Sequence, residues 1–301
     1  MIKIPPYLKI GNTVGIICPS GFMPLEKTNE CVNTLKQWGY NVKVGKTVGA
    51  QHHYFSGTDE ERLADLQMMM DDENIHAILC ARGGYGMGRI VEQLNFKKFL
   101  KKPKWIIGFS DITVLHSHLY SRYRMASMHA PMANAFNEKD NIEYLNSLKN
   151  SLKGDKANYT CNAQPFSRDG KCRGRLVGGN LSILTHLIGT SSDVNTKNKI
   201  LFLEDVGEYI YNIDRMMYQL KRAGKLKHLA GLIVGGFTEI KDTAVSYGMT
   251  AEACIADIIK EYKFPIAFGF PVSHAKENFA LKVGIKYELI NSGNLTSLIE
   301  I

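Results

Sequence analysis

The chain has 301 residues, 45% of them hydrophobic, so it can bury one large core or two ordinary ones, and we expect two domains. Its 37 Lys and Arg residues exceed its 29 Asp and Glu residues and are dispersed, which favours small anionic substrates and argues against a nucleic-acid partner. The six cysteines include no CxxC pair, which excludes a disulfide framework and indicates reduced thiols.

The N-terminal stretch MIKIPPYLKIGNTVGII carries prolines and lysines where a signal peptide needs an unbroken apolar segment. No apolar stretch of the chain approaches the length that a transmembrane helix requires. We therefore expect a cytoplasmic protein without a membrane partner.

The first half of the chain alternates short apolar strands with helical patterns. Residues 24–38 place apolar side chains on one helical face before Gly39, and Thr58 with Glu61 predicts a capping box that opens a second helix. The predicted strands are apolar or β-branched and end near Gly, Pro or Ser: TVGIICPS, YNVKVG, IHAILCAR and KWIIGFS. This alternation predicts a flavodoxin-like or Rossmann-like domain with a parallel sheet and flanking helices.

Residues 136–172 lose this alternation and turn polar, so we place the division between two domains there. The second half restarts with strand patterns in KILFLEDV and LAGLIVGGF and helix patterns in NIDRMMYQLKRAG and TAEACIADIIKEY. The alternation in PIAFGF, ALKVGIKYELI and LTSLIEI predicts a β-rich C-terminus. We therefore predict an N-terminal α/β domain (residues 1–150), a linker (151–172) and a smaller C-terminal α/β domain (173–301).

A glycine-rich loop follows one of the predicted strands, where parallel sheets bind their ligands. In RGGYGMGR, Gly84, Gly86 and Gly88 give G-x-G-x-G, which lacks the third glycine position of the dinucleotide fingerprint. No suitably placed ribose-binding acid follows, so the pattern disfavours nucleotide binding. Two alternatives stay open: a flexible turn, or a turn whose backbone amides hold an oxyanion.

Ser110 in KWIIGFSDITVL lies at the corner between a predicted strand and a predicted helix, where a nucleophile can be presented. Asp111 follows in the first turn of that helix, whose free amides point toward the corner. The stretch departs from the α/β-hydrolase elbow because position 112 is Ile rather than Gly. The local sequence leaves both a catalytic serine and a helix-capping serine open.

A catalytic serine needs a base, and nine histidines are present. His129 and His274 each follow a predicted strand, where catalytic loops gather. Glu204 and Asp205 end an apolar strand in the same way, with a helix cap or a surface charge as the alternative. The chain shows no convincing His or Cys spacing for a metal, so we expect no metal or other cofactor.

Six motifs, in this order over essentially the whole chain, resemble the LD-carboxypeptidase family: GIICPSG, ARGGYGMGRI, IIGFSDIT, LVGGNLSIL, LFLEDVGEYIYNIDRM and GFPVSHAKEN. The resemblance implies a serine peptidase with Ser110 as nucleophile, Glu204 as acid and His274 as base. It also implies an oxyanion hole formed by the backbone amides of Gly84 and Asp111. The implied fold is an N-terminal α/β domain with a smaller C-terminal α/β domain.

Two positions affect how the site residues of the family are assigned to this chain. The stretch LEDVGE holds three acids, and Glu204 is assigned in place of Asp205 or Glu208 because it ends the strand, as the family's acid does. Ser273 stands before His274, where the family often has glycine. Neither feature removes a chemical group that the mechanism needs.

The resemblance implies hydrolysis of the L,D-amide bond to the terminal D-alanine of peptidoglycan tetrapeptides, in cytoplasmic murein recycling. One alternative is a microcin C immunity peptidase, which cleaves peptidyl-nucleotide analogues and for which Tyr209 and Tyr211 are candidate stacking residues. An alternative of another class is a non-catalytic peptide-binding protein, although the intact Ser, Glu and His weigh against it. We also expect a homodimer, although the sequence itself does not specify the oligomeric state.

Overall fold

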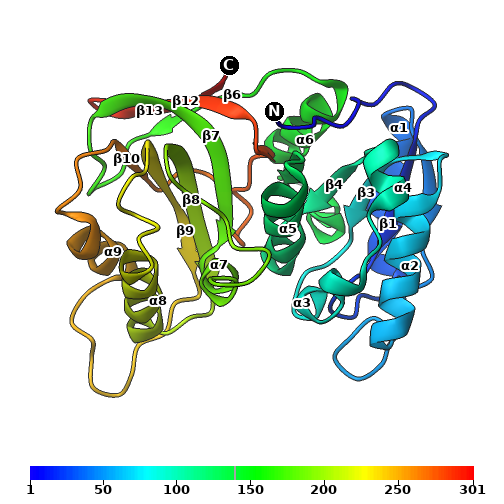
Figure 1. Cartoon of the computed structure of the whole chain (residues 1–301), viewed down its shortest axis with the longest axis horizontal. Coiled ribbons are helices and arrows are strands. Elements are labelled where there is room, and N and C mark those ends of the chain that lie inside the picture. The colour runs from blue at the N-terminus through cyan, green and yellow to red at the C-terminus, as the bar shows by residue number, and fades with distance from the viewer. Residues whose placement is uncertain (139) are drawn as a thin grey trace. The chain divides into compact units, whose positions relative to one another are not determined.

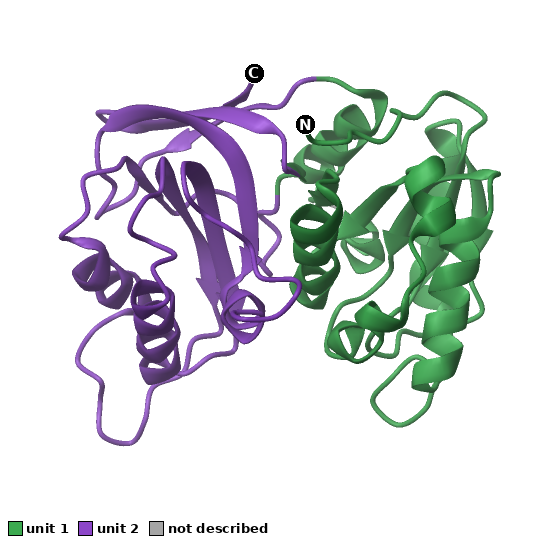
Figure 2. Cartoon of the chain, viewed as in Figure 1, with its two compact units in different colours: residues 1–155, 279–282 green, residues 156–278, 283–301 purple. Residues whose placement is uncertain are grey.

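The computed structural model describes residues 1–138 and 140–301. The chain divides into two compact units, which we call unit 1 (residues 1–155 and 279–282) and unit 2 (residues 156–278 and 283–301) (Figure 2). Each unit has its own β-sheet with helices beside it (Figure 1). The predicted α/β fold, with a parallel sheet and a second α/β domain, is confirmed.

The sheet of unit 1 has six strands in the order β11-β5-β4-β3-β1-β2, and the strands from β5 to β2 pair in parallel. Its strands are β1 (Thr13–Ile17), β2 (Asn41–Val44), β3 (Ile75–Cys80), β4 (Trp105–Gly108), β5 (Ser127–His129) and β11 (Leu281–Val283). β1, β3 and β4 are almost continuously buried, as central strands of a covered parallel sheet are. Their carboxyl ends stand side by side, because the three strands are neighbours in the sheet.

Helices of unit 1 connect these strands. They are α1 (Asn29–Gln37), α2 (Asp59–Asp71), α3 (Met87–Ile90), α4 (Lys97–Lys101), α5 (Thr113–Tyr123) and α6 (Ile142–Lys153), with 3-10 turns at Leu25–Thr28, Val91–Gln93, Ser110–Ile112 and Ala133–Asn137. The predicted capping box of α2 is confirmed, because Thr58 Oγ1 accepts a hydrogen bond from Glu61 N and the Glu61 carboxylate accepts one from Thr58 N. α1 ends before Gly39, whose φ of +90° favours glycine.

The sheet of unit 2 has seven strands in the order β10-β9-β8-β7-β12-β13-β6. β7 to β10 pair in parallel, and β12, β13 and β6 add an antiparallel part. The strands are β6 (Asn158–Asn162), β7 (Gly170–Asn180), β8 (Lys199–Val206), β9 (Gly231–Thr238), β10 (Ile266–Phe268), β12 (Lys286–Ser292) and β13 (Leu295–Glu300). The helices are α7 (Leu181–His186), α8 (Ile210–Arg222) and α9 (Ala251–Ile259). The predicted β-rich C-terminus is confirmed.

The segment 151–172, predicted as a linker, contains ordered elements. α6 continues to Lys153, β6 pairs with β13 at the edge of the sheet, and β7 begins at Gly170. The residues of β6 alternate between exposed and half-buried, because one face of this edge strand meets solvent. Its sequence NYTCN therefore lacks the apolar run from which a central strand is predicted.

The six cysteines are free thiols, and most are buried. Burial, the main cause, raises the pKa of the Cys18 thiol to about 12 and that of Cys172 to about 11. These thiols are therefore protonated at neutral pH and poor nucleophiles. Within the described part of the chain, every helix is too short or too polar to cross a membrane.

Candidate functional site

Loops at the carboxyl ends of three parallel strands contact one another in unit 1. Gly21 N, in the loop after β1, donates a hydrogen bond of 2.9 Å to Gly83 O, in the loop after β3. A Cβ atom placed on Gly83 would lie 2.8 Å from the Cβ of Ser110, which follows β4. The loops after β1, β3 and β4 therefore come together beside Ser110. We call residues 82–88 the glycine-rich loop.

Ser110 itself has a left-handed backbone conformation. Its φ is +62°, which costs a residue with a side chain on the order of 1 kcal/mol. β4 ends at Gly108, and the 3-10 turn at Ser110–Ile112 leads directly into α5. No side-chain capping hydrogen bond is present at this turn or at the start of α5. Such strain gathers at functional positions, so this conformation is compatible with a nucleophile presented at the corner, and that role stays a prediction.

Backbone amides expected to bind an oxyanion lie in the segments that border this serine. A Cβ atom on Gly83 would stand 3.0 Å from Ser110 Oγ and 3.2 Å from Asp111 N, so the two segments are in close contact. Gly84 turns the chain there with a φ of +94°, which glycine adopts without strain. The assignment of the Gly84 and Asp111 amides to an oxyanion hole stays a prediction.

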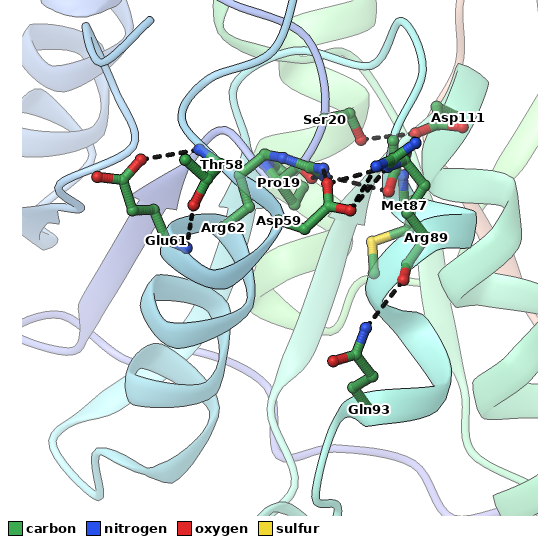
Figure 3. Close-up of polar contacts among 11 residues, drawn as sticks. Pro19, Ser20, Thr58, Asp59, Glu61, Arg62, Met87, Arg89, Gln93 and Asp111 are labelled. Carbon is green, nitrogen blue, oxygen red and sulfur yellow. Dashed lines mark hydrogen bonds and ion pairs between the residues drawn. The ribbon is translucent and has the colours of Figure 1, made fainter. Parts of the chain in front are cut away.

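Sequence reasoning missed two side chains, Ser20 and Arg62, that hold these loops (Figure 3). Ser20 Oγ donates a hydrogen bond of 2.6 Å to the carboxylate of Asp111. The fully buried Arg62 donates from Nη1 to Pro19 O over 2.7 Å. A sequence signal existed for Arg62, because it shares a helical face with buried apolar residues of α2 and its charge therefore occupies a core position.

In unit 2, Glu204 and His274 form a buried pair. Glu204 ends the apolar part of β8 with a fully buried side chain, and its Oε2 lies 2.5 Å from Nδ1 of His274. Burial by itself lowers the pKa of His274, but the adjacent Glu204 carboxylate raises it, and the net pKa lies above the ordinary value. Because this bond uses Nδ1, the nitrogen that would exchange a proton with a reacting group is Nε2.

Two glycines of β9 allow the His274 loop to approach the sheet closely. A Cβ atom on Gly235 would lie 2.1 Å from Val272 O, and one on Gly236 would lie 2.5 Å from the Cβ of Ser273. Ser273 Oγ forms two hydrogen bonds of 3.0 Å with the backbone just beyond His274. Ser273, where the related family often has glycine, thus stabilises the turn that carries the histidine.

Hydrogen bonds distinguish the three acids of LEDVGE. Asp205 accepts from Asn180 Nδ2 over 2.8 Å and from the backbone at the start of α7 over 2.9 Å. Burial, the largest cause, raises the pKa of Asp205 to about 6. Glu208 accepts from an asparagine in the first turn of α8 over 3.1 Å. These bonds direct Asp205 and Glu208 toward helices, whereas Glu204 bonds to His274.

His129, the other candidate base, lies in the core of unit 1. It is fully buried, and its ring centre is 5.6 Å from that of Phe109. His116, in α5, bonds through Nε2 to Gly108 O over 2.8 Å, and burial lowers the pKa of His116 to about 4. Among residues 1–138 and 140–301, no three His, Cys, Asp or Glu side chains gather where they could hold a metal ion.

Comparisons with known proteins identify the same family in both halves of the chain. Residues 14–130 match the LD-carboxypeptidase N-terminal domain, and residues 173–289 match the LD-carboxypeptidase C-terminal domain. The chain is 36% identical to the probable murein peptide carboxypeptidase of Bacillus subtilis (strain 168), over 98% of this chain and 94% of that protein. It is 26% identical to the microcin C7 self-immunity protein MccF of Escherichia coli, over 93% of this chain and 90% of that protein.

A solved structure shows the same architecture. The muramoyltetrapeptide carboxypeptidase from Oxalobacter formigenes superimposes with a TM-score of 0.88 at 28% identity, covering 96% of this chain and 99% of that one. Family match, sequence identity and fold agree over nearly the whole length. The chain therefore belongs to the LD-carboxypeptidase family and is a hydrolase of the serine carboxypeptidase type.

Proposed function

We propose that the protein hydrolyses the L,D-amide bond to the terminal D-alanine of peptidoglycan tetrapeptides, with Ser110, Glu204 and His274 as its triad. The observation that carries the proposal is the buried hydrogen bond of 2.5 Å between Glu204 and His274. A histidine held at Nδ1 by a carboxylate is the base that a serine nucleophile requires. The names of two relatives, a murein peptide carboxypeptidase and a muramoyltetrapeptide carboxypeptidase, support the substrate class.

In the proposed reaction, His274 Nε2 takes the proton of Ser110 as Oγ attacks the carbonyl carbon before D-alanine. The carbonyl electron pair moves to oxygen, and the amides of Gly84 and Asp111 bind the resulting oxyanion. His274 then gives its proton to the amide nitrogen, the C–N bond breaks and D-alanine leaves. Water, deprotonated by His274, hydrolyses the acyl-enzyme and releases the tripeptide, while Glu204 stabilises each imidazolium.

A peptidyl nucleotide of the microcin type is the alternative substrate, and the relative named MccF is the reason to test it. The candidate stacking residues, Tyr209 and Tyr211, are partly exposed and stack on each other at 5.5 Å. Lys241 lies over the Tyr209 ring at 5.9 Å, and Arg215 lies over the Tyr211 ring at 5.3 Å. Each of the two rings thus already has an aromatic and a cationic neighbour, so we favour the tetrapeptide.

The proposal also includes a cytoplasmic role in murein recycling and a homodimeric state, without a nucleic-acid or membrane partner. These parts rest on the family resemblance and the composition rather than on the site. Light scattering of the purified protein tests the dimer, and fractionation of cells that express it tests the location. A function limited to peptide binding is the alternative in another class, and it leaves the buried Glu204–His274 bond without a role.

The decisive experiment is mass spectrometry of the purified protein with L-Ala-D-Glu-meso-diaminopimelate-D-Ala and, separately, with a processed microcin. We expect the wild-type protein to convert the tetrapeptide into tripeptide and D-alanine, and Ser110→Ala to leave it intact. If the protein cleaves the microcin faster than the tetrapeptide, the peptidyl nucleotide becomes the proposed substrate. If a folded wild-type protein cleaves neither compound, the enzymatic proposal is wrong.

A further inference from the structure

We propose that Arg62 and the carboxylate of Asp111 are positioning residues that hold the glycine-rich loop in the shape that oxyanion binding needs. All the contacts that carry this inference lie within unit 1. The inference rests on the proposed function, because it concerns the amides that the reaction uses. It assigns no contact with substrate to either side chain.

Arg62 joins two of the converging loops through one guanidinium group (Figure 3). From Nη1 it donates to Pro19 O, in the loop after β1, over 2.7 Å, and to Gly86 O, in the glycine-rich loop, over 3.1 Å. The side chain is fully buried on the inner face of α2. A buried charge is costly unless it is paired and hydrogen-bonded, so its retention here calls for a specific role.

Asp59, one turn earlier on α2, orients this guanidinium and extends the network. Its carboxylate accepts from Nη2 of Arg62 and also binds Arg89 in α3, with distances of 2.8 Å to Nε and 2.7 Å to Nη2. The hydrogen bond from Arg89 is the main cause that lowers the pKa of Asp59. Asp59 therefore stays ionised and connects α2 with the helix that follows the glycine-rich loop.

Asp111 holds the same loop from the other side. One carboxylate oxygen, Oδ2, accepts from Ser20 Oγ over 2.6 Å and from Met87 N, at the end of the glycine-rich loop, over 2.7 Å. The side chain is almost completely buried. Asp111 also carries one of the two amides assigned to the oxyanion hole. Its side chain thus ties that amide to the loop that supplies the other, Gly84.

The loop needs such external contacts because glycine has no conformational preference of its own. Gly86 has a φ of +142°, and a Cβ atom there would lie 2.7 Å from Arg62 Nη1. The guanidinium therefore fills the space that a side chain at position 86 would take. Removing it would leave both a buried void and a flexible backbone beside Ser110. We expect the loss to appear in turnover, because oxyanion donors act in the transition state.

The test compares Arg62→Met and Arg62→Lys with Lys104→Met as the matched control. Lys104 is also a buried cation of unit 1 that donates to two backbone carbonyls, but it precedes β4 at the opposite end of the strands. We expect Arg62→Met to lower kcat for the tetrapeptide about 10- to 100-fold with little change in KM, because one lost oxyanion donor costs roughly 10² to 10³. Arg62→Lys should fall between Arg62→Met and the wild type, because an ammonium retains the charge but lacks the two nitrogens that bond the carbonyls and Asp59 at the same time. Lys104→Met should lower Tm and leave kcat unchanged.

The inference is overturned if Arg62→Met and Lys104→Met lose similar amounts of Tm and both keep the wild-type kcat. That result would leave the proposed function intact. If Arg62→Met does not fold, Arg62→Lys decides in the same way. If the wild-type protein does not cleave the tetrapeptide, the proposed function fails, and the rate at which a fluorophosphonate labels Ser110 decides the inference. The phosphoryl oxygen of this probe occupies the oxyanion hole. If the probe labels Arg62→Lys as fast as it labels the wild type, the inference is overturned. Absence of labelling in the wild type would overturn both.

Discussion

Replacing Gly83 by alanine tests whether the glycine-rich loop contacts Ser110, the proposed nucleophile. The new methyl group would stand 2.8 Å from Ser110 Cβ and 3.0 Å from its Oγ. Carbon atoms in favourable contact are about 3.5–4.0 Å apart, so the serine or the loop must move by roughly 1 Å. A misplacement of about 1 Å costs roughly 10²-fold in rate. We therefore expect kcat/KM for the tetrapeptide to fall about 100-fold in Gly83→Ala, with about 1–3 kcal/mol of lost stability from overpacking.

Gly88→Ala is the control within the same loop, because a Cβ atom at Gly88 would have no atom of residues 1–138 or 140–301 within 4 Å. Gly88 lies in α3, where alanine is favoured over glycine by up to about 1 kcal/mol. We expect Gly88→Ala to keep wild-type kcat/KM and to have a Tm at or above that of the wild type. The assay is D-alanine release by each purified variant, with thermal unfolding beside it. If Gly83→Ala turns over the tetrapeptide as fast as Gly88→Ala, the reasoning from this contact is refuted.

The remaining predictions concern the proposed triad and its chemistry. Ser110→Ala and His274→Ala should each lower kcat for D-alanine release on the order of 10⁵-fold, and Glu204→Ala somewhat less. Ser110→Ala should leave Tm nearly unchanged, and wild-type turnover by this variant would disprove the covalent mechanism. Since Glu204 raises the pKa of His274 above its ordinary 6.5 and the base must be neutral, kcat/KM should rise with pH through that elevated pKa. Glu204→Gln should move this rise to lower pH, and an unchanged pH profile would contradict the pairing. Prolonged EDTA treatment should leave turnover intact, whereas a loss restored by zinc would exclude the serine mechanism.

Burial explains which elements of the fold could be predicted from the sequence. The central strands β1, β3 and β4 are almost wholly buried, so each has an apolar run that stands out between polar loops. β6 was missed because an edge strand with one solvent face carries polar residues and has no such run. The capping box of α2 could be predicted without any burial pattern, because it depends only on two side chains at a fixed spacing.

The candidate site depended more on the family resemblance than on local patterns. The sequence around Ser110 fits a helix cap as well as a nucleophile, and the distinguishing feature is its φ of +62°. That conformation belongs to a strand-to-helix corner fixed by tertiary contacts, among them the close approach of Gly83. The choice of Glu204 over Asp205 likewise depends on which carboxylate faces His274, and neighbouring residues of a strand face opposite sides.

The spacing of the glycines in the glycine-rich loop does not predict which of them packs against Ser110. The G-x-G-x-G pattern drew attention to Gly84, Gly86 and Gly88, yet Gly83, outside that pattern, makes the closest approach to Ser110. A side chain at Gly84 would meet a tyrosine hydroxyl at 2.8 Å, and one at Gly86 would meet a buried guanidinium at 2.7 Å. A Cβ atom at Gly88 would meet nothing within 4 Å in the described part of the chain. At three of the four glycines a side chain would thus come within 3 Å of neighbouring protein atoms. Close packing within the protein, in part against Ser110, therefore accounts for these glycines without the phosphate contacts of the dinucleotide fingerprint, from which their spacing departs.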